Sequence, residues 1–67
     1  MAKIQLNGRK IALKQNFSIQ DLLKKYKLNG KKVAVELNGK ILPNNMYKNR
    51  KLKKNDRIEI VQFIGGG

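Results

Sequence analysis

Apolar and polar residues alternate along two short segments near the start of the chain, residues 3–6 and 11–14. An alternation with a period of two is typical of a β-strand that buries one face. Asn7-Gly8 lies between the segments, and this dipeptide favours a tight type I′ turn because both central residues accept positive φ. The pattern therefore predicts a β-hairpin. Its inward-facing side chains are expected to be Ile4, Leu6, Ile11 and Leu13.

A short amphipathic helix is predicted after this hairpin. Ser18 suits the N-cap, and Asp21, three residues later, can complete a capping box. Phe17 and Leu22 have the spacing of a hydrophobic staple. The apolar stripe is formed by Ile19, Leu22, Leu23 and Tyr26. We expect a helix of about ten residues that depends on a sheet for its stability and ends at Asn29-Gly30.

A second hairpin is predicted over residues 32–42. Its first strand, residues 32–37, places three apolar side chains on one face, those of Val33, Val35 and Leu37. Asn38-Gly39 again favours a tight turn. The return strand begins at Lys40 and stops before Pro43, which has no N–H to donate to a sheet.

The remainder of the chain is a polar excursion followed by one last strand. Residues 43–55 are rich in turn-forming residues, and we expect three apolar anchors among them, Met46, Tyr47 and Leu52. After a turn at Asn55-Asp56, residues 57–64 form the final strand.

The order of these elements is ββαββ, a loop, then β. It predicts an α+β fold of the β-grasp (ubiquitin-like) type, with a mixed sheet of about four to five strands and one helix packed across it. A central last strand runs parallel to the first, because the intervening elements supply the crossover that a parallel pair needs. We expect residues 1–67 to form one domain without repeats, with residues 65–67 as a flexible tail.

The composition argues against an enzyme. The chain has no Cys and no His, which excludes a histidine-based triad and a zinc site of the usual ligand types. The four acidic residues are scattered along the sequence, so no paired-carboxylate mechanism is indicated. We find no apolar run of membrane-spanning length and no signal peptide, and we therefore expect a cytoplasmic protein. We also expect no bound cofactor, and no bound metal because His and Cys are absent.

The net charge of +12, taken alone, favours a polyanion as the partner. However, the lysines are spread over nearly every predicted element, and arginine occurs only at positions 9, 50 and 57. Aromatic residues for base stacking are also few. A solvated basic surface is the favoured interpretation, and a basic nucleic-acid-binding module is the alternative.

The final strand and the glycine tail after it are the candidate functional region. With Ile58 and Ile60 inward, Val61 and Phe63 face outward, where they form a candidate partner-docking patch or ordinary exposed apolar positions. Gly65, Gly66 and Gly67 lack Cβ atoms, so the tail is slim enough to thread a narrow channel. The reactive group that this tail delivers is the α-carboxylate of Gly67, which becomes an electrophile once it is activated. The plain alternative is a frayed chain end.

Several of these segments, taken together, resemble one family. They are the opening residues 4–8, V-A-V-E-L-N-G at residues 33–39, Pro43, and D-R-I-E-I-V-Q-F-I-G-G-G at residues 56–67. The sequence is similar to the sulfur carrier proteins of thiamine biosynthesis, the ThiS family. A terminal Gly-Gly alone is shared with ubiquitin and with the small subunit of molybdopterin synthase, so the longer segments make the resemblance specific.

The resemblance implies a mechanism. A ubiquitin-activating-type adenylyltransferase uses ATP and Mg²⁺ to adenylate the Gly67 carboxylate. Sulfur from a persulfide donor, a cysteine desulfurase or a rhodanese-like protein, then converts it to a thiocarboxylate, and thiazole synthase takes that sulfur. Val61 and Phe63 match positions that relatives turn toward their enzymes. A carrier for molybdopterin or another sulfur pathway is the nearest alternative, and the lysine excess departs from the family's usual charge.

Overall fold

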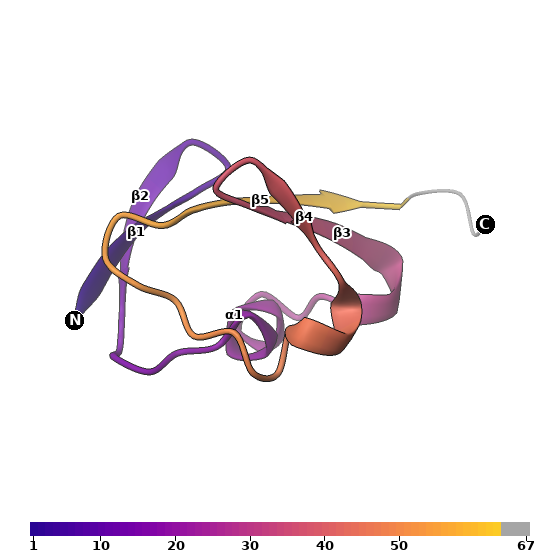
Figure 1. The fold of residues 1–67 in the computed structure, drawn as a ribbon, viewed down its shortest axis with the longest axis horizontal. Coiled ribbons are helices and arrows are strands. Elements are labelled where there is room, and N and C mark those ends of the chain that lie inside the picture. Colours follow the sequence, from indigo (N-terminus) through magenta and orange to yellow (C-terminus); the bar gives the residue numbers. More distant parts are fainter. Residues whose placement is uncertain (64–67) are drawn as a thin grey trace.

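The structure is a computed structural model that describes residues 1–63. It contains one five-stranded sheet and one α-helix (Figure 1). The elements, in chain order, are β1 (Ala2–Leu6), β2 (Arg9–Leu13), α1 (Ile19–Lys25), β3 (Val33–Leu37), β4 (Lys40–Leu42) and β5 (Arg57–Gln62), with 3₁₀ helices at Gly30–Lys32 and Asn44–Met46. The helix lies across one face of the sheet, and the opposite face is left uncovered by any helix among these residues.

The sheet has the strand order β2-β1-β5-β3-β4, so the last strand lies in its centre. β5 pairs in parallel with β1 and antiparallel with β3. The helix and the second hairpin form the crossover between the parallel strands, as the sequence predicted. This is the β-grasp arrangement, and the predicted fold class is confirmed.

Both Asn-Gly turns have the predicted geometry. Asn7 and Gly8 have φ of 48° and 82°, and Asn38 and Gly39 have φ of 53° and 86°. Two consecutive positive φ angles define the type I′ turn, whose twist matches that of the flanking strands. The turns fix the hairpin registers, in which Ile4 is opposite Ile11 and Val35 is opposite Leu42.

The helix begins as predicted and ends earlier. Ser18 Oγ accepts a hydrogen bond from the Asp21 N–H at 3.0 Å, and the Asp21 carboxylate accepts one from the Ser18 N–H at 3.0 Å, which completes the capping box. However, α1 spans seven residues and does not reach Asn29-Gly30. Lys27 takes the left-handed conformation with φ of 57°, and the Leu28 N–H returns to the Leu23 carbonyl at 2.8 Å. This is a Schellman-type ending.

The core lies between the helix and the inward face of the sheet. Its buried residues are Ile4, Leu13, Ile19, Leu22, Leu23, Val33, Val35, Leu37, Tyr47, Leu52 and Ile58. Tyr47 and Leu52 thus anchor the polar excursion as expected. Two predictions were wrong: Met46 is 45% exposed, and Tyr26, which is the C-cap of the helix, is 43% exposed, so neither belongs to the buried core.

Candidate functional site

The strand that leads to the C-terminal tail is held by backbone hydrogen bonds on both of its edges. β5 is predicted to extend to residue 64, but the structure ends it at Gln62, opposite Val33. One further hydrogen bond joins the Phe63 N–H to the Lys32 carbonyl at 2.8 Å. Hydrogen bonds therefore hold the backbone in place as far as Phe63. Ile64, Gly65, Gly66 and Gly67 lie outside the described residues.

Each hairpin turn also braces β5 with its asparagine side chain. Asn7 Oδ1 accepts from the Ile60 N–H at 2.8 Å, and Asn7 Nδ2 donates to the Ile60 carbonyl at 3.3 Å. On the other edge, Asn38 Oδ1 accepts from the Arg57 N–H at 2.8 Å, and the Asn38 N–H donates to the Arg57 carbonyl at 2.7 Å. The sequence predicted these asparagines only as turn residues, since their partners are distant along the chain.

Asp56 anchors the beginning of the same strand. This carboxylate is 7% exposed and accepts hydrogen bonds from Asn38 Nδ2 at 3.0 Å and from the Lys53 N–H at 2.7 Å. Arg50 Nη2 lies 3.3 Å from it, which makes the one ion pair found among residues 1–63. A buried carboxylate with several donors is well satisfied, and we assign Asp56 a structural role.

The uncovered face of the sheet carries the predicted docking residues. Val61 is 60% exposed and Phe63 is 58% exposed, so neither the helix nor a loop covers them. The outward side chains of β3 and β4 extend this surface: Ala34 is directly opposite Val61, and Ile41 is 75% exposed. Ile41 was missed from the sequence, because its place on this face depends on the β3–β4 register. We call Ile41, Val61 and Phe63 the apolar patch.

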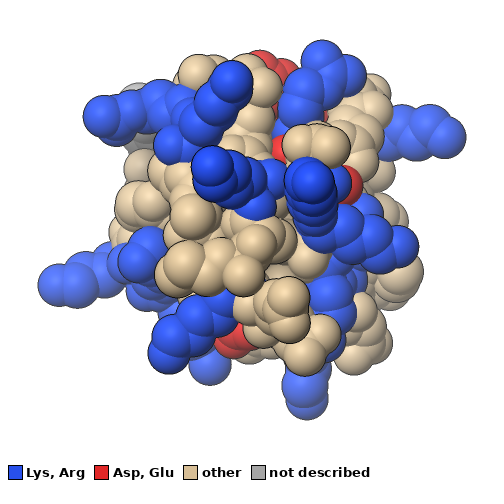
Figure 2. Space-filling view, turned by 90° about the vertical axis from the view of Figure 1, so that its left-hand side faces the viewer, with Lys and Arg blue, Asp and Glu red and all other residues tan. Residues whose placement is uncertain are grey.

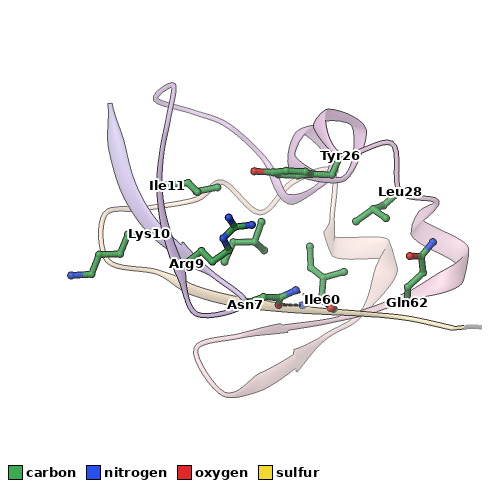
Figure 3. A pocket seen from close by; sticks show the side chains of 9 residues that line it. Asn7, Arg9, Lys10, Ile11, Tyr26, Leu28, Ile60 and Gln62 are labelled. Atoms are coloured by element: carbon green, nitrogen blue, oxygen red, sulfur yellow. Dashed lines mark hydrogen bonds between the residues drawn. The ribbon is translucent and has the colours of Figure 1, made fainter.

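The opposite side of the tail-bearing strand borders a cleft of about 630 Å³ (Figure 3). Half-buried aliphatic side chains line it, together with Tyr26 and Gln62. In Figure 3, Arg9 points into this cleft whereas Lys10 points away from it. The cleft has no carboxylate, cysteine or histidine in its lining, and such groups are the usual nucleophiles and bases of enzymes.

The perturbed titratable groups are structural ones. The hydrogen bonds from Ser18 hold the pKa of Asp21 below its ordinary value, and burial raises the pKa of the Tyr47 hydroxyl.

Within residues 1–63 no group of three or more metal-ligating side chains is found. In the same part of the chain, no helix is long and apolar enough to cross a membrane.

These features define a class of protein: a ubiquitin-like β-grasp domain that presents the end of its central strand and an adjoining apolar patch. The family model of ThiS matches residues 3–67, so the match includes the glycine tail, and the chain belongs to the ThiS family.

Similar proteins agree with this assignment. The chain is 45% identical to the sulfur carrier protein ThiS of Bacillus subtilis, over 96% of this chain and 98% of that one. Its fold matches the crystal structure of the thiamine biosynthesis protein ThiS from Geobacter metallireducens with a TM-score of 0.81 and 28% identity, covering 97% and 99% of the two chains. A thiazole synthase of Paramagnetospirillum magneticum is 35% identical over 97% of this chain, which corresponds to 20% of that protein. The family match and these similar proteins confirm the predicted function, a sulfur carrier in thiamine biosynthesis.

Proposed function

We propose that this sulfur carrier works through the carboxylate of Gly67, which is first adenylated and then converted to a thiocarboxylate. The observation that supports this proposal most directly is the family match, which extends through the glycine tail to residue 67. The exposed patch beside the tail-bearing strand and the absence of His and Cys agree with a carrier that is acted on by other proteins.

The proposed chemistry has three steps. A ubiquitin-activating-type adenylyltransferase joins the Gly67 carboxylate to AMP from ATP, with Mg²⁺, and pyrophosphate leaves. The terminal sulfur of a persulfide, held by a cysteine desulfurase or a rhodanese-like donor, then attacks the glycyl carbonyl and AMP leaves. A second thiol then attacks the donor's sulfur in this acyl disulfide, which forms a disulfide between that thiol and the donor and releases the Gly67 thiocarboxylate. The carrier contributes an unhindered acyl group, because Gly65, Gly66 and Gly67 have no side chain to obstruct a narrow channel.

Thiazole synthase is the proposed acceptor of the sulfur. Support comes from the Paramagnetospirillum protein of that name, because a segment amounting to 20% of it aligns with nearly all of this chain. A carrier-like segment within the same polypeptide as a synthase is kept at high effective concentration next to it. We further propose that Val61 and Phe63 are the surface by which the adenylyltransferase and the synthase hold the carrier, in the cytoplasm.

The pathway is tested by reconstituting thiazole formation from the adenylyltransferase, a persulfide donor, ATP, Mg²⁺, thiazole synthase and this carrier. We expect product with the full chain, and none when Gly67 is deleted or when a bulky residue is added after it. The matched control adds the same residue before Met1, which leaves the tail intact. Activity with molybdopterin synthase in place of thiazole synthase, and none with the latter, would overturn the assignment.

A further inference from the structure

The uncovered face of the sheet has a second region, at the end that lies away from the apolar patch. Lys10, Gln5 and Arg57 are aligned across β2, β1 and β5, since Gln5 is in register with both of the others. Side chains in register project from the same face of a sheet, and Lys3 lies two residues before Gln5 on that face. Three cationic side chains are thus grouped on neighbouring strands.

These cations surround a shallow depression of about 330 Å³, which we call the cationic depression. It is lined by Lys3, Ile4, Gln5, Lys10, Asn55 and Arg57, and no acidic residue is among them. The loop before β5 adds Lys53 and Lys54 nearby in the sequence. Figure 2, which shows the side of the molecule that bears β1 and β2, displays many Lys and Arg side chains and little acidic surface. Lys3, Lys10 and Arg57 form no ion pair within residues 1–63.

Two glutamates lie between the cationic depression and Val61, in the cross-strand row that ends at Ile41 of β4. Glu59 of β5 is directly opposite Glu36 of β3 on the uncovered face. Two like charges in such a position destabilise a sheet. Among the described residues neither glutamate has a salt-bridge partner. Along one strand the face therefore changes from cationic at Arg57 to acidic at Glu59 and apolar at Val61.

The three regions are close enough to belong to one interface. Arg57 and Val61 are separated by roughly 13 Å, at about 3.3 Å per residue of strand. A protein that buries about 800 Å² on each partner covers a patch roughly 30 Å across. A partner that covers Val61 and Phe63 therefore reaches the cationic depression as well.

We propose that the cationic depression is the far part of the docking surface and binds an acidic patch on the adenylyltransferase that activates the tail. The inference rests on the proposed function and adds the chemistry of the partner's surface. The partner is expected to place carboxylates opposite Lys3, Lys10 and Arg57. It is expected to place a cation opposite Glu36 and Glu59. Complementary charges of this kind accelerate association and fix the orientation of docking. A partner in that orientation receives the tail at the apolar end of the surface.

A protein partner fits this face better than a nucleic acid does. The cationic depression contains one arginine and no aromatic residue for base stacking. The neighbouring glutamates would repel a phosphate backbone that followed β5. The cations and the apolar patch also share one continuous face of the sheet.

The test compares two variants with equal changes in charge. In the first, Lys3, Lys10 and Arg57 are replaced by Gln; in the control, Lys24, Lys25 and Lys48, which are exposed and outside this face, are replaced by Gln. The association rate with the cognate adenylyltransferase is measured by stopped-flow over a range of salt concentrations. We expect the first variant to associate at least about tenfold more slowly at low salt, with a weaker salt dependence, and the control to change about twofold or less.

Equal effects of the two variants, or no effect of the first, would overturn the inference. The inference would also be overturned if the first variant lost binding to a single-stranded oligonucleotide but associated with the adenylyltransferase at an unchanged rate. Thiocarboxylate formation by the original chain at saturating adenylyltransferase separates the two proposals. If the original chain forms no thiocarboxylate, then the proposed function fails and the docking result stands on its own. Thermal unfolding of both variants verifies that they fold.

Discussion

The two faces of the sheet are made from the same strands but differ in exposure. On the face under the helix, Ile4, Val35 and Ile58 are 2%, 0% and 1% exposed. On the uncovered face, Ile41, Val61 and Phe63 are 58–75% exposed. Because neighbouring residues of a strand point to opposite faces, a change at one position in β5 is expected to affect folding and a change at the next to affect docking. Stability and partner recognition can thus be altered separately in one strand.

The largest effect on stability is expected from Ile58→Ala. Ile58 is a residue of the central strand β5, and its side chain is buried in the core. Truncation of a buried isoleucine leaves a cavity and typically lowers the free energy of unfolding by about 2–5 kcal/mol. Urea denaturation measures the loss. The matched variant Val61→Ala, on the opposite face of β5, is expected to change the free energy of unfolding by about 0.5 kcal/mol or less. Equal losses would contradict the separation of the two faces.

The paired replacement Val61→Ser and Phe63→Ser tests the uncovered face. We expect the KM for the carrier in the adenylation reaction to rise at least about tenfold, as loss of an apolar anchor typically costs more than about 1 kcal/mol of binding. The melting temperature is expected to change little, because both side chains are exposed. Met46→Ser is the control, since Met46 is exposed in the 3₁₀ helix Asn44–Met46 and lies outside the apolar patch. A rise in KM for Met46→Ser as large as that for the paired variant would mean that the apolar patch is not specific.

A smaller effect is expected when the asparagine braces of β5 are removed. Asn7→Gly and Asn38→Gly keep the positive φ of each turn but delete the side chain that bonds to β5. We expect each to lower the free energy of unfolding by about 1–2 kcal/mol, as hydrogen bonds are worth about 1 kcal/mol each. Hydrogen exchange at Ile60 should accelerate in Asn7→Gly and not in Asn38→Gly. Unchanged exchange at Ile60 would show that the Asn7 side chain does not brace the strand.

The smallest effect is expected at the helix cap, away from both faces of β5. Ser18 lowers the pKa of Asp21 in the folded state, so the ionised carboxylate contributes stability above its ordinary pKa of 3.8. That contribution is lost as the pH falls through the lower, folded-state pKa. We therefore expect Asp21→Asn to be less stable than the original chain at about pH 7 and equal to it at about pH 2. Thermal unfolding at both pH values checks this, and a deficit that persists in acid would contradict it.

The fold was predictable because its signals are local. The alternation of apolar and polar residues and the two Asn-Gly turns indicate the strands, and the capping box indicates where the helix begins. The end of the helix was not predictable, because Lys27 takes a left-handed conformation that sequence patterns associate with Gly or Asn. The position of Tyr26 was also predicted wrongly, since it is the exposed C-cap of the helix and not part of the core.

The residues of the proposed docking surface were only partly predictable from the sequence. The exposure of Val61 and Phe63 was predicted, because they break the polar pattern expected on the outer face of a strand. Ile41 and the cationic depression were missed, because both depend on the registers of β3 with β4 and of β1 with β5. The sequence alone does not give these registers. The glycine tail was recognised from its residue types and its resemblance to a family, without any knowledge of its structure.

The central claim is that Gly67 carries the sulfur, and intact-mass measurement tests it most directly. The chain is incubated with the adenylyltransferase, ATP, Mg²⁺ and a persulfide donor, and then fragmented to locate any change. We predict a gain in mass equal to the exchange of one oxygen atom for one sulfur atom, located at Gly67 and absent when ATP is omitted. An unchanged mass with an adenylyltransferase that is active on another carrier, or a sulfur located elsewhere, would contradict the account.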